Sequence, residues 1–158
     1  MAEDQTMERI SAAIGRLHSG DKEGARASFE QIWSGLGEDA DPFHVCTLSH
    51  YMADAQDEAR SELEWDLRAL EAAYRVTNGR AKAYHASLTI KSFYPSLHLN
   101  VGDACLRLGD IEKAREHARA ARSALSDLPD SPYAETTRDA IARLSQRVEE
   151  AGGSVPGT

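Results

Sequence analysis

Residues 99–121 read LNVGDACLRLGDIEKAREHARAA, and they hold the pattern that decides the fold. The pair Gly109 and Asp110 interrupts two runs rich in the strong helix formers Ala, Leu, Glu and Arg. A small residue, Gly102, stands eight positions before Asp110, and another, Ala114, stands four positions after it. Small residues at such places let neighbouring helices approach closely. The stretch therefore predicts two α-helices that pack together across a short turn.

The same arrangement occurs twice more along the chain. Gly20 and Asp21, and then Gln56 and Asp57, also lie between two helical patterns. Asp57 follows Asp21 by 36 residues, and Asp110 follows Asp57 by 53 residues. Aligned on these aspartates, the residues eight positions earlier are all small: Ala13, Ser49 and Gly102. We therefore expect three related helix pairs.

The rest of the chain is also helical in pattern, and no stretch alternates with the period of two that indicates a strand. Asp41 before Pro42, and Ser131 before Pro132, have the form of a helix N-cap followed by proline in the first turn. By the same reasoning Pro95 is expected in the first turn of a helix that ends near Leu108. The sequence thus predicts an all-α protein.

The repeated pattern resembles the tetratricopeptide repeat (TPR) family, whose helix–turn–helix unit is about 34 residues long. Gly102, Gly109, Ala114 and Ala121 fall on small positions of that family. The middle unit departs from the pattern through serines at two of these positions. The resemblance covers roughly residues 6–128. Within the family, the chain is most similar to small stand-alone repeat proteins of bacteria. It implies a TPR-like right-handed stack of helical hairpins.

The resemblance also implies a domain organisation. The spacing of 53 residues exceeds the family period by about 19, which indicates an inserted segment, expected to contain a further helix or a helix and a loop. We expect a single helical domain over residues 1–151, closed by a C-terminal capping helix, and a flexible tail. The expected parts are units at about 6–38, 41–76 and 94–128, an insert at about 72–93, the capping helix at 131–151 and the tail at 152–158.

Composition excludes several classes of partner. The 26 acidic residues outnumber the 18 basic ones and give a formal net charge of −8, which disfavours nucleic acid and anionic membranes. No apolar run approaches the length of a membrane span, and the polar N-terminus does not have the form of a secretory signal. Two cysteines do not make a disulfide framework. We expect a cytoplasmic protein that binds neither nucleic acid nor membranes.

In the TPR family the first helix of each pair lines a concave groove. The resemblance therefore implies a non-catalytic module that binds a protein or peptide in this groove. A regulatory role is one expectation for such a module. Ile10 and Ile14 stand where chaperone-binding members carry Lys and Asn, and isoleucine offers no donor to a carboxylate, so that partner class is not expected. The expected groove residues are Ile10, Ile14, Cys46, His50, Asp54, Leu99, Asp103 and Arg107.

One alternative concerns Cys46, His50 and Asp54, which follow one another at intervals of four and share a helix face. Thiolate, imidazole and carboxylate are metal ligands, and a thiol beside an imidazole is also a nucleophile–base pair. The pattern lacks an established closed-site spacing and a neighbouring glycine-rich turn. We therefore expect ordinary helix packing there, with no metal and no cofactor.

Tyr84 and His85 lie in the inserted segment, where a lid over the groove is one expectation. The alternative function that combines these features is a small-ligand or metal-binding protein, with an enzyme included. It would use His50 and Asp54 beneath the lid. A third alternative is self-association into a homodimer.

Overall fold

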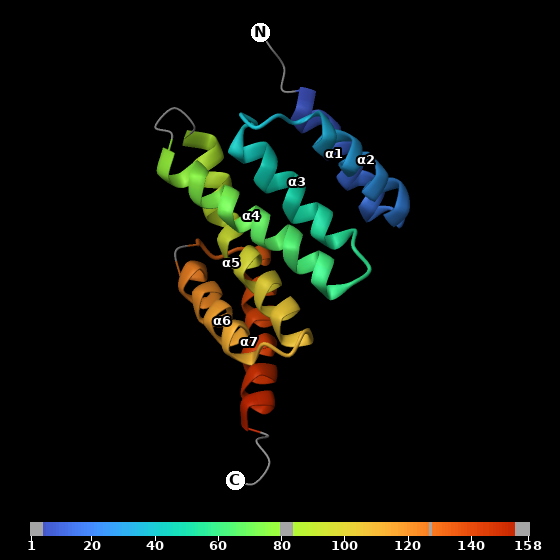
Figure 1. Cartoon of the computed structure of the whole chain (residues 1–158). Coiled ribbons are helices and arrows are strands. Elements are labelled where there is room, and N and C mark those ends of the chain that lie inside the picture. Colours follow the sequence, from blue (N-terminus) through green and yellow to red (C-terminus); the bar gives the residue numbers. More distant parts are fainter. Residues whose placement is uncertain (1–4, 80–83, 127, 154–158) are drawn as a thin grey trace. The chain divides into compact units, whose positions relative to one another are not determined.

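The computed structural model describes residues 5–79, 84–126 and 128–153, and in these residues the chain forms seven α-helices and no strand (Figure 1). The predicted all-α class is confirmed. None of the helices in the described residues is long and apolar enough to span a membrane. The helices are α1 (Gln5–His18), α2 (Lys22–Gly35), α3 (Pro42–Asp54), α4 (Ala59–Gly79), α5 (Tyr84–Arg107), α6 (Ile111–Leu125) and α7 (Pro132–Gly153).

Side chains of the predicted kind mark four helix starts. Asp21 Oδ1 accepts a hydrogen bond from Gly24 N at 2.9 Å at the start of α2, and Asp110 Oδ1 accepts one from Lys113 N at 3.2 Å at the start of α6. Asp41 caps α3 through Phe43 N, and Ser131 Oγ accepts from the backbone at the start of α7. Each cap satisfies an N–H group that the first helical turn leaves without a partner.

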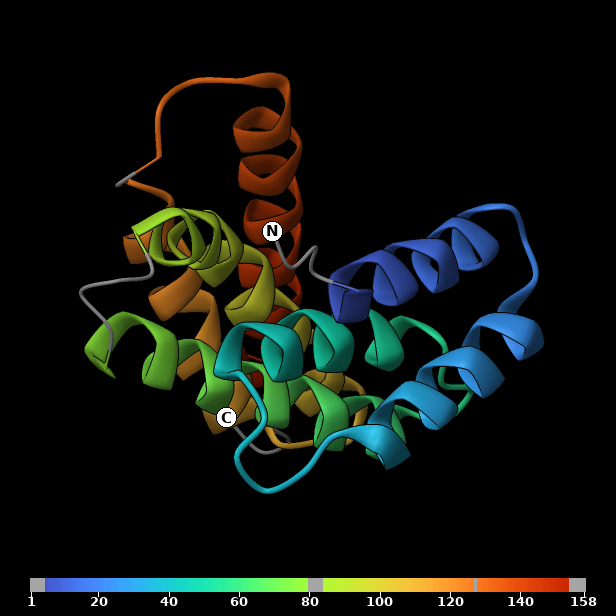
Figure 2. The ribbon, with the colours of Figure 1, turned by 90° about the horizontal axis from the view of Figure 1, so that it is seen from above.

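The turns after α1 and α5 have the same backbone geometry. Gly20 and Gly109 have φ values of 96° and 88°, in the left-handed region that glycine enters without steric cost. Asp21 N donates to Arg16 O and Asp110 N donates to Cys105 O, each across five residues. Both turns therefore close their helix with a Schellman motif, and the short turn between α1 and α2 is visible at the edge of Figure 2.

The chain divides into two compact units, Met1–Gly79 (unit 1) and Arg80–Thr158 (unit 2), and each is described by itself. In unit 1, α1 contacts α2, α3 contacts α4, and both α1 and α2 contact α3. Large side chains fill the space between these helices, with Trp33 and Trp65 packed at its margin in an edge-to-face pair. The largest fully buried side chains in this cluster are Ile10, Phe29, Leu48 and Met52.

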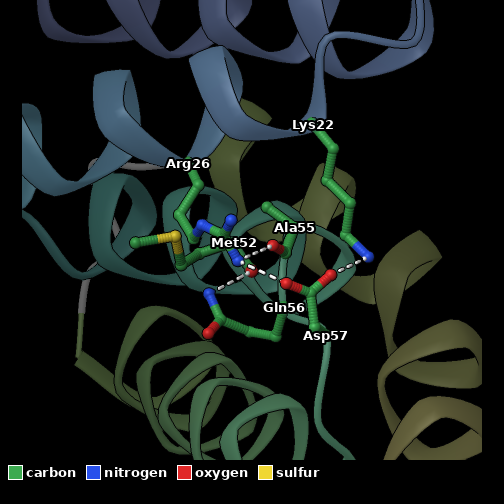
Figure 3. Close-up of polar contacts among 6 residues, drawn as sticks. All are labelled: Lys22, Arg26, Met52, Ala55, Gln56 and Asp57. Carbon is green, nitrogen blue, oxygen red and sulfur yellow. Dashed lines mark hydrogen bonds and ion pairs between the residues drawn. The ribbon is translucent and has the colours of Figure 1, made fainter.

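Asp57 differs from the two aspartates with which it was aligned. It lies outside α4, in the connection after α3, and pairs with Lys22 Nζ at 2.8 Å and Arg26 Nη1 at 3.1 Å (Figure 3). Arg26 Nη1 also donates to Ala55 O at 3.3 Å. The α3–α4 connection is thus held to α2 by side-chain contacts instead of the Schellman turn that closes α1 and α5.

In unit 2, α6 contacts α5, and α7 contacts both of them. Alanines line the buried side of α6, where Ala114 and Ala121 are 0% exposed. Gly102 of α5 is also buried, and a Cβ atom there would lie 2.9 Å from Leu144 Cδ2 and 3.4 Å from Ala114 O. A side chain larger than that of alanine would be crowded at this place, because α5 approaches both neighbours closely. Ala13, Ser49 and Gly102 are all buried.

The expected insert is taken up by longer helices. Instead of a separate helix, α4 continues for 21 residues to Gly79, and α5 has 24 residues and begins at Tyr84. The prediction for Pro95 is wrong, because Pro95 lies inside α5 and not in its first turn. An interior proline removes the hydrogen bond to the carbonyl four residues earlier, here that of Lys91. Lys91 is exposed, so water can reach this part of the helix.

Candidate functional site

A cavity of about 230 Å³ lies between α5 and α7 in unit 2. Helix α5 contributes two of the predicted groove residues, Leu99 and Asp103, together with Asn100. Helix α7 faces them with charged and apolar side chains at helical spacing: Ala140, Arg143, Leu144 and Arg147. The structure thus brings part of the predicted groove together with residues of the last helix.

Asp103 is the centre of the ionic contacts in this cavity. Its Oδ2 atom lies 2.9 Å from Arg107 Nε, and its Oδ1 atom lies 2.9 Å from Arg147 Nη1. The first contact joins residues one turn apart on α5, and the second joins α5 to α7. All three side chains are partly exposed, so the contacts are accessible to solvent and to a ligand.

Arg143 and Leu99 offer different chemistry on either side of Asp103. Arg143 is exposed and forms no ion pair or hydrogen bond with any residue that the structure describes. Leu99 is half-buried and packs against the cluster of Ala121, Leu125, Ala134 and Ile141. The cavity therefore combines an available guanidinium group, an apolar wall and a carboxylate that already holds two cations.

The two groove residues predicted from α1 differ in their exposure to solvent. Ile10 is 0% exposed and belongs to the core of unit 1, and Ile14 is half-buried against the same core. The prediction that Ile10 contacts a partner needs correction, because its apolar side chain stabilises unit 1 by leaving water, whereas the prediction for Ile14 stays a prediction.

Cys46 and His50 of α3 are also core residues. Cys46 is 0% exposed and His50 is 8% exposed. Burial raises the pKa of the Cys46 thiol to about 12 and lowers the pKa of His50 to about 4. Both groups are therefore neutral at pH 7. A thiol in this state is a poor nucleophile, so the alternative of a Cys46–His50 catalytic pair is not supported.

Asp54 lies at the end of α3 and is exposed, unlike Cys46 and His50. Partial loss of water and the nearby Glu62 raise the pKa of Asp54 to about 6, although His18 acts in the opposite direction. Among the described residues, no group of three or more His, Cys, Asp and Glu side chains is placed to hold a metal ion. The described residues therefore do not support the alternative of a metal site at Cys46, His50 and Asp54.

The lid prediction concerns Tyr84 and His85. Both belong to the first turn of α5 by their backbone, but their side chains lie outside the described residues.

Sequence reasoning missed Arg143 and Arg147, because it assigned the last helix only a capping role. Their separation by four residues places both on one face of α7, which is the signal that was available. It also missed the pairing of His98 with His117, whose Nδ1 atoms lie 3.0 Å apart across α5 and α6. Burial and the neighbouring His117 lower the pKa of His98 to about 4.

Comparisons with known proteins provide no relative from which a function could be inferred. No family model, curated protein or solved structure matches the chain.

Proposed function

We propose that this chain is a non-catalytic, TPR-like module of the cytoplasm that binds an acidic peptide segment of a partner protein. In this proposal its helix pairs form the right-handed stack that the resemblance implies. The repeated Schellman turns at Gly20 and Gly109 and the burial of Ala13, Ser49 and Gly102 support related helix pairs. The contacts of α7 with both α5 and α6 support its role as the closing helix.

The cavity between α5 and α7 carries the functional part of the proposal. Arg143 has no partner among the described residues, so a carboxylate of the ligand would form a charge-assisted hydrogen bond with it. Leu99 and Leu144 would contact an apolar side chain beside that carboxylate. The cavity of about 230 Å³ is below the usual size of a pocket for a drug-sized molecule, and it can accept a single anchoring side chain of a larger ligand.

The charge balance of the cavity favours an acidic ligand over a basic one. Asp103 is already paired with Arg107 and Arg147, so its charge is more than balanced before a ligand arrives. Arg143 adds a further positive charge at the same surface. A basic peptide would meet this excess charge, whereas an acidic peptide would relieve it.

A peptide library displayed on phage tests the proposal. Selection on the wild-type protein should enrich peptides in which Asp or Glu lies near a large apolar residue. Arg143→Glu should weaken the binding of a selected peptide at least tenfold, because attraction becomes repulsion, and Leu99→Ala should weaken it by a smaller factor. Fluorescence anisotropy with the labelled peptide measures both effects.

Arg138→Glu provides the matched control. Arg138 lies on the same helix but outside the cavity, where its nearest acidic partner is Asp130 at 3.6 Å. Binding should be nearly unchanged in this variant. Enrichment of basic peptides, or equal losses in the Arg138 and Arg143 variants, would reject the proposal.

A further inference from the structure

Another cavity lies in unit 1, between α1 and α2, and its volume is also about 230 Å³. Its lining combines the buried apolar residues Ala13 and Ile32 with side chains that carry hydrogen-bond donors. The lining residues are Arg9, Ala12, Ala13 and Arg16 from α1 and Ser28, Gln31 and Ile32 from α2. Among these residues none is acidic, although acidic residues outnumber basic ones 26 to 18 in the chain.

The two arginines of this cavity lack a counter-ion within the described part of the chain. Arg9 and Arg16 are both exposed and neither forms an ion pair there. Arg16 Nη1 approaches Ser28 Oγ at 3.4 Å, which joins the guanidinium to a hydroxyl and leaves its charge uncompensated. Gln31 adds an amide that has no hydrogen-bond partner among the described residues.

The spacing of the arginines defines the shape of the positive region. Seven residues separate Arg9 from Arg16, so they lie about two turns, or about 10 Å, apart on one side of α1. The small side chains of Ala12 and Ala13 lie between them and leave the cavity open. A ligand in this cavity would therefore lie between two cations, with Ser28 and Gln31 beside it.

The α5–α7 cavity shows how the chain itself satisfies a similar pair of arginines. There Asp103 contacts two guanidinium groups at 2.9 Å each. The α1–α2 cavity has the cations without the carboxylate. We propose that this cavity is a separate binding site for the oxyanion of a small molecule, a carboxylate or a phosphate group, held by Arg9 and Arg16. This proposal does not depend on the peptide-binding function of unit 2.

Titration of the full chain with inorganic phosphate and, separately, with succinate tests the site. Backbone amide NMR signals should shift and saturate in the millimolar range for at least one probe, with the largest shifts at Ala12, Ala13, Ser28 and Gln31. Ionic strength is kept constant with chloride, because a general salt effect does not saturate at one site. Saturation by phosphate alone indicates a phosphorylated ligand, and saturation by succinate alone indicates a carboxylate ligand.

The double variant Arg9→Gln/Arg16→Gln should raise the dissociation constant of the bound phosphate or succinate at least tenfold. Arg60→Gln is the control, because Arg60 is an exposed arginine of α4 in the same unit and does not line the cavity. Arg143→Glu, which disables the proposed peptide site, should leave this binding intact. The proposal would be overturned by shifts that persist in the double variant or by shifts that never saturate with either probe. It would also be overturned if acidic peptides, but neither small anion, bound at the α1–α2 cavity.

Discussion

The two units solve the same packing problem with side chains of different size. Unit 1 combines the buried Ala13 and Ala25 with the large Phe29, whereas unit 2 has Gly102 where α5 approaches Leu144 and the alanines of α6. Yet the turns after α1 and α5 have the same hydrogen-bond pattern. The comparison shows that the same turn geometry is compatible with alanine or glycine at the buried small position, Ala13 in α1 and Gly102 in α5, and with different large side chains around it.

Acid gives the largest expected effect, and it acts on both units through one buried histidine each. Burial lowers the pKa of His50 and of His98 to about 4, below the ordinary histidine value of 6.5. The unfolded chain therefore binds more protons below pH 6.5, and stability falls as the pH drops from there toward 4. His50 should remove about 3 kcal/mol of stability over this range, and His98 a smaller amount, because the neighbouring His117 shares its titration.

Urea denaturation at a series of pH values, followed by far-UV circular dichroism, measures this loss. Asp54 acts in the opposite direction, because its raised pKa of about 6 favours the folded state as that carboxyl takes up a proton. His50→Gln and His98→Gln should each reduce the pH dependence. A pH dependence unchanged in both variants would contradict the assignment of the acid sensitivity to these histidines.

Phe29→Ala should have the next largest effect. Phe29 is 0% exposed in the core of unit 1, and its removal leaves a cavity among side chains that are too large to close it. The expected loss is about 3–5 kcal/mol of unfolding free energy. Leu67→Ala is the control in the same unit, because Leu67 is 45% exposed. Comparable losses in the two variants would show that unit 1 does not depend on its large core residues.

Gly102→Leu tests the narrow contact in unit 2. A leucine side chain would collide with Leu144 and with the backbone of Ala114, and we expect a loss of about 1–3 kcal/mol through overpacking. Gly102→Ala should change stability much less, since the closest atom to the new Cβ is the end of the Leu144 side chain. The higher helix propensity of alanine, about 1 kcal/mol, also offsets the crowding. Equal thermal shifts in the two variants would rule out a close helix approach at this position.

The smallest effects concern the three aligned aspartates. Asp21→Ala and Asp110→Ala each remove an N-cap and should cost about 1 kcal/mol. Asp57→Ala removes only exposed contacts with Lys22 and Arg26 and should cost less than either cap. Moderate salt should reduce the Asp57 effect more than the cap effects, as chemical denaturation with urea in two salt concentrations would show. A salt response shared by all three variants would argue against their different roles.

Local sequence signals predicted much of the secondary structure. Asp41 and Ser131 cap helices as expected, and Asp21 and Asp110 begin helices at the predicted breaks, because a cap requires only the residue and the next few backbone groups. Pro95 was misplaced for the opposite reason. Pro95 is less than 2% exposed inside α5, so tertiary packing outweighs the local cost of an interior proline.

The candidate site was less predictable than the helices. Leu99 and Asp103 were found through a family resemblance, but the arginines that face them depend on which side of α7 packs against α5. Ile10, Cys46 and His50 were expected in a groove and are buried instead, because sequence alone does not reveal which helix covers an apolar face. Contacts between residues far apart in the chain, such as Asp103 with Arg147, account for these differences.

The position of Asp103 has a consequence for selectivity in the proposed peptide site. Its carboxylate acts as a resident competitor, because it occupies Arg107 and Arg147 before any outside anion arrives. A simple anion gains little binding energy where Asp103 already pairs with two arginines, so ions such as acetate should be weak inhibitors of peptide binding. Discrimination at the α5–α7 cavity would then come from ligands that reach Arg143 and cover Leu99 at once, and this site would bind simple anions only weakly.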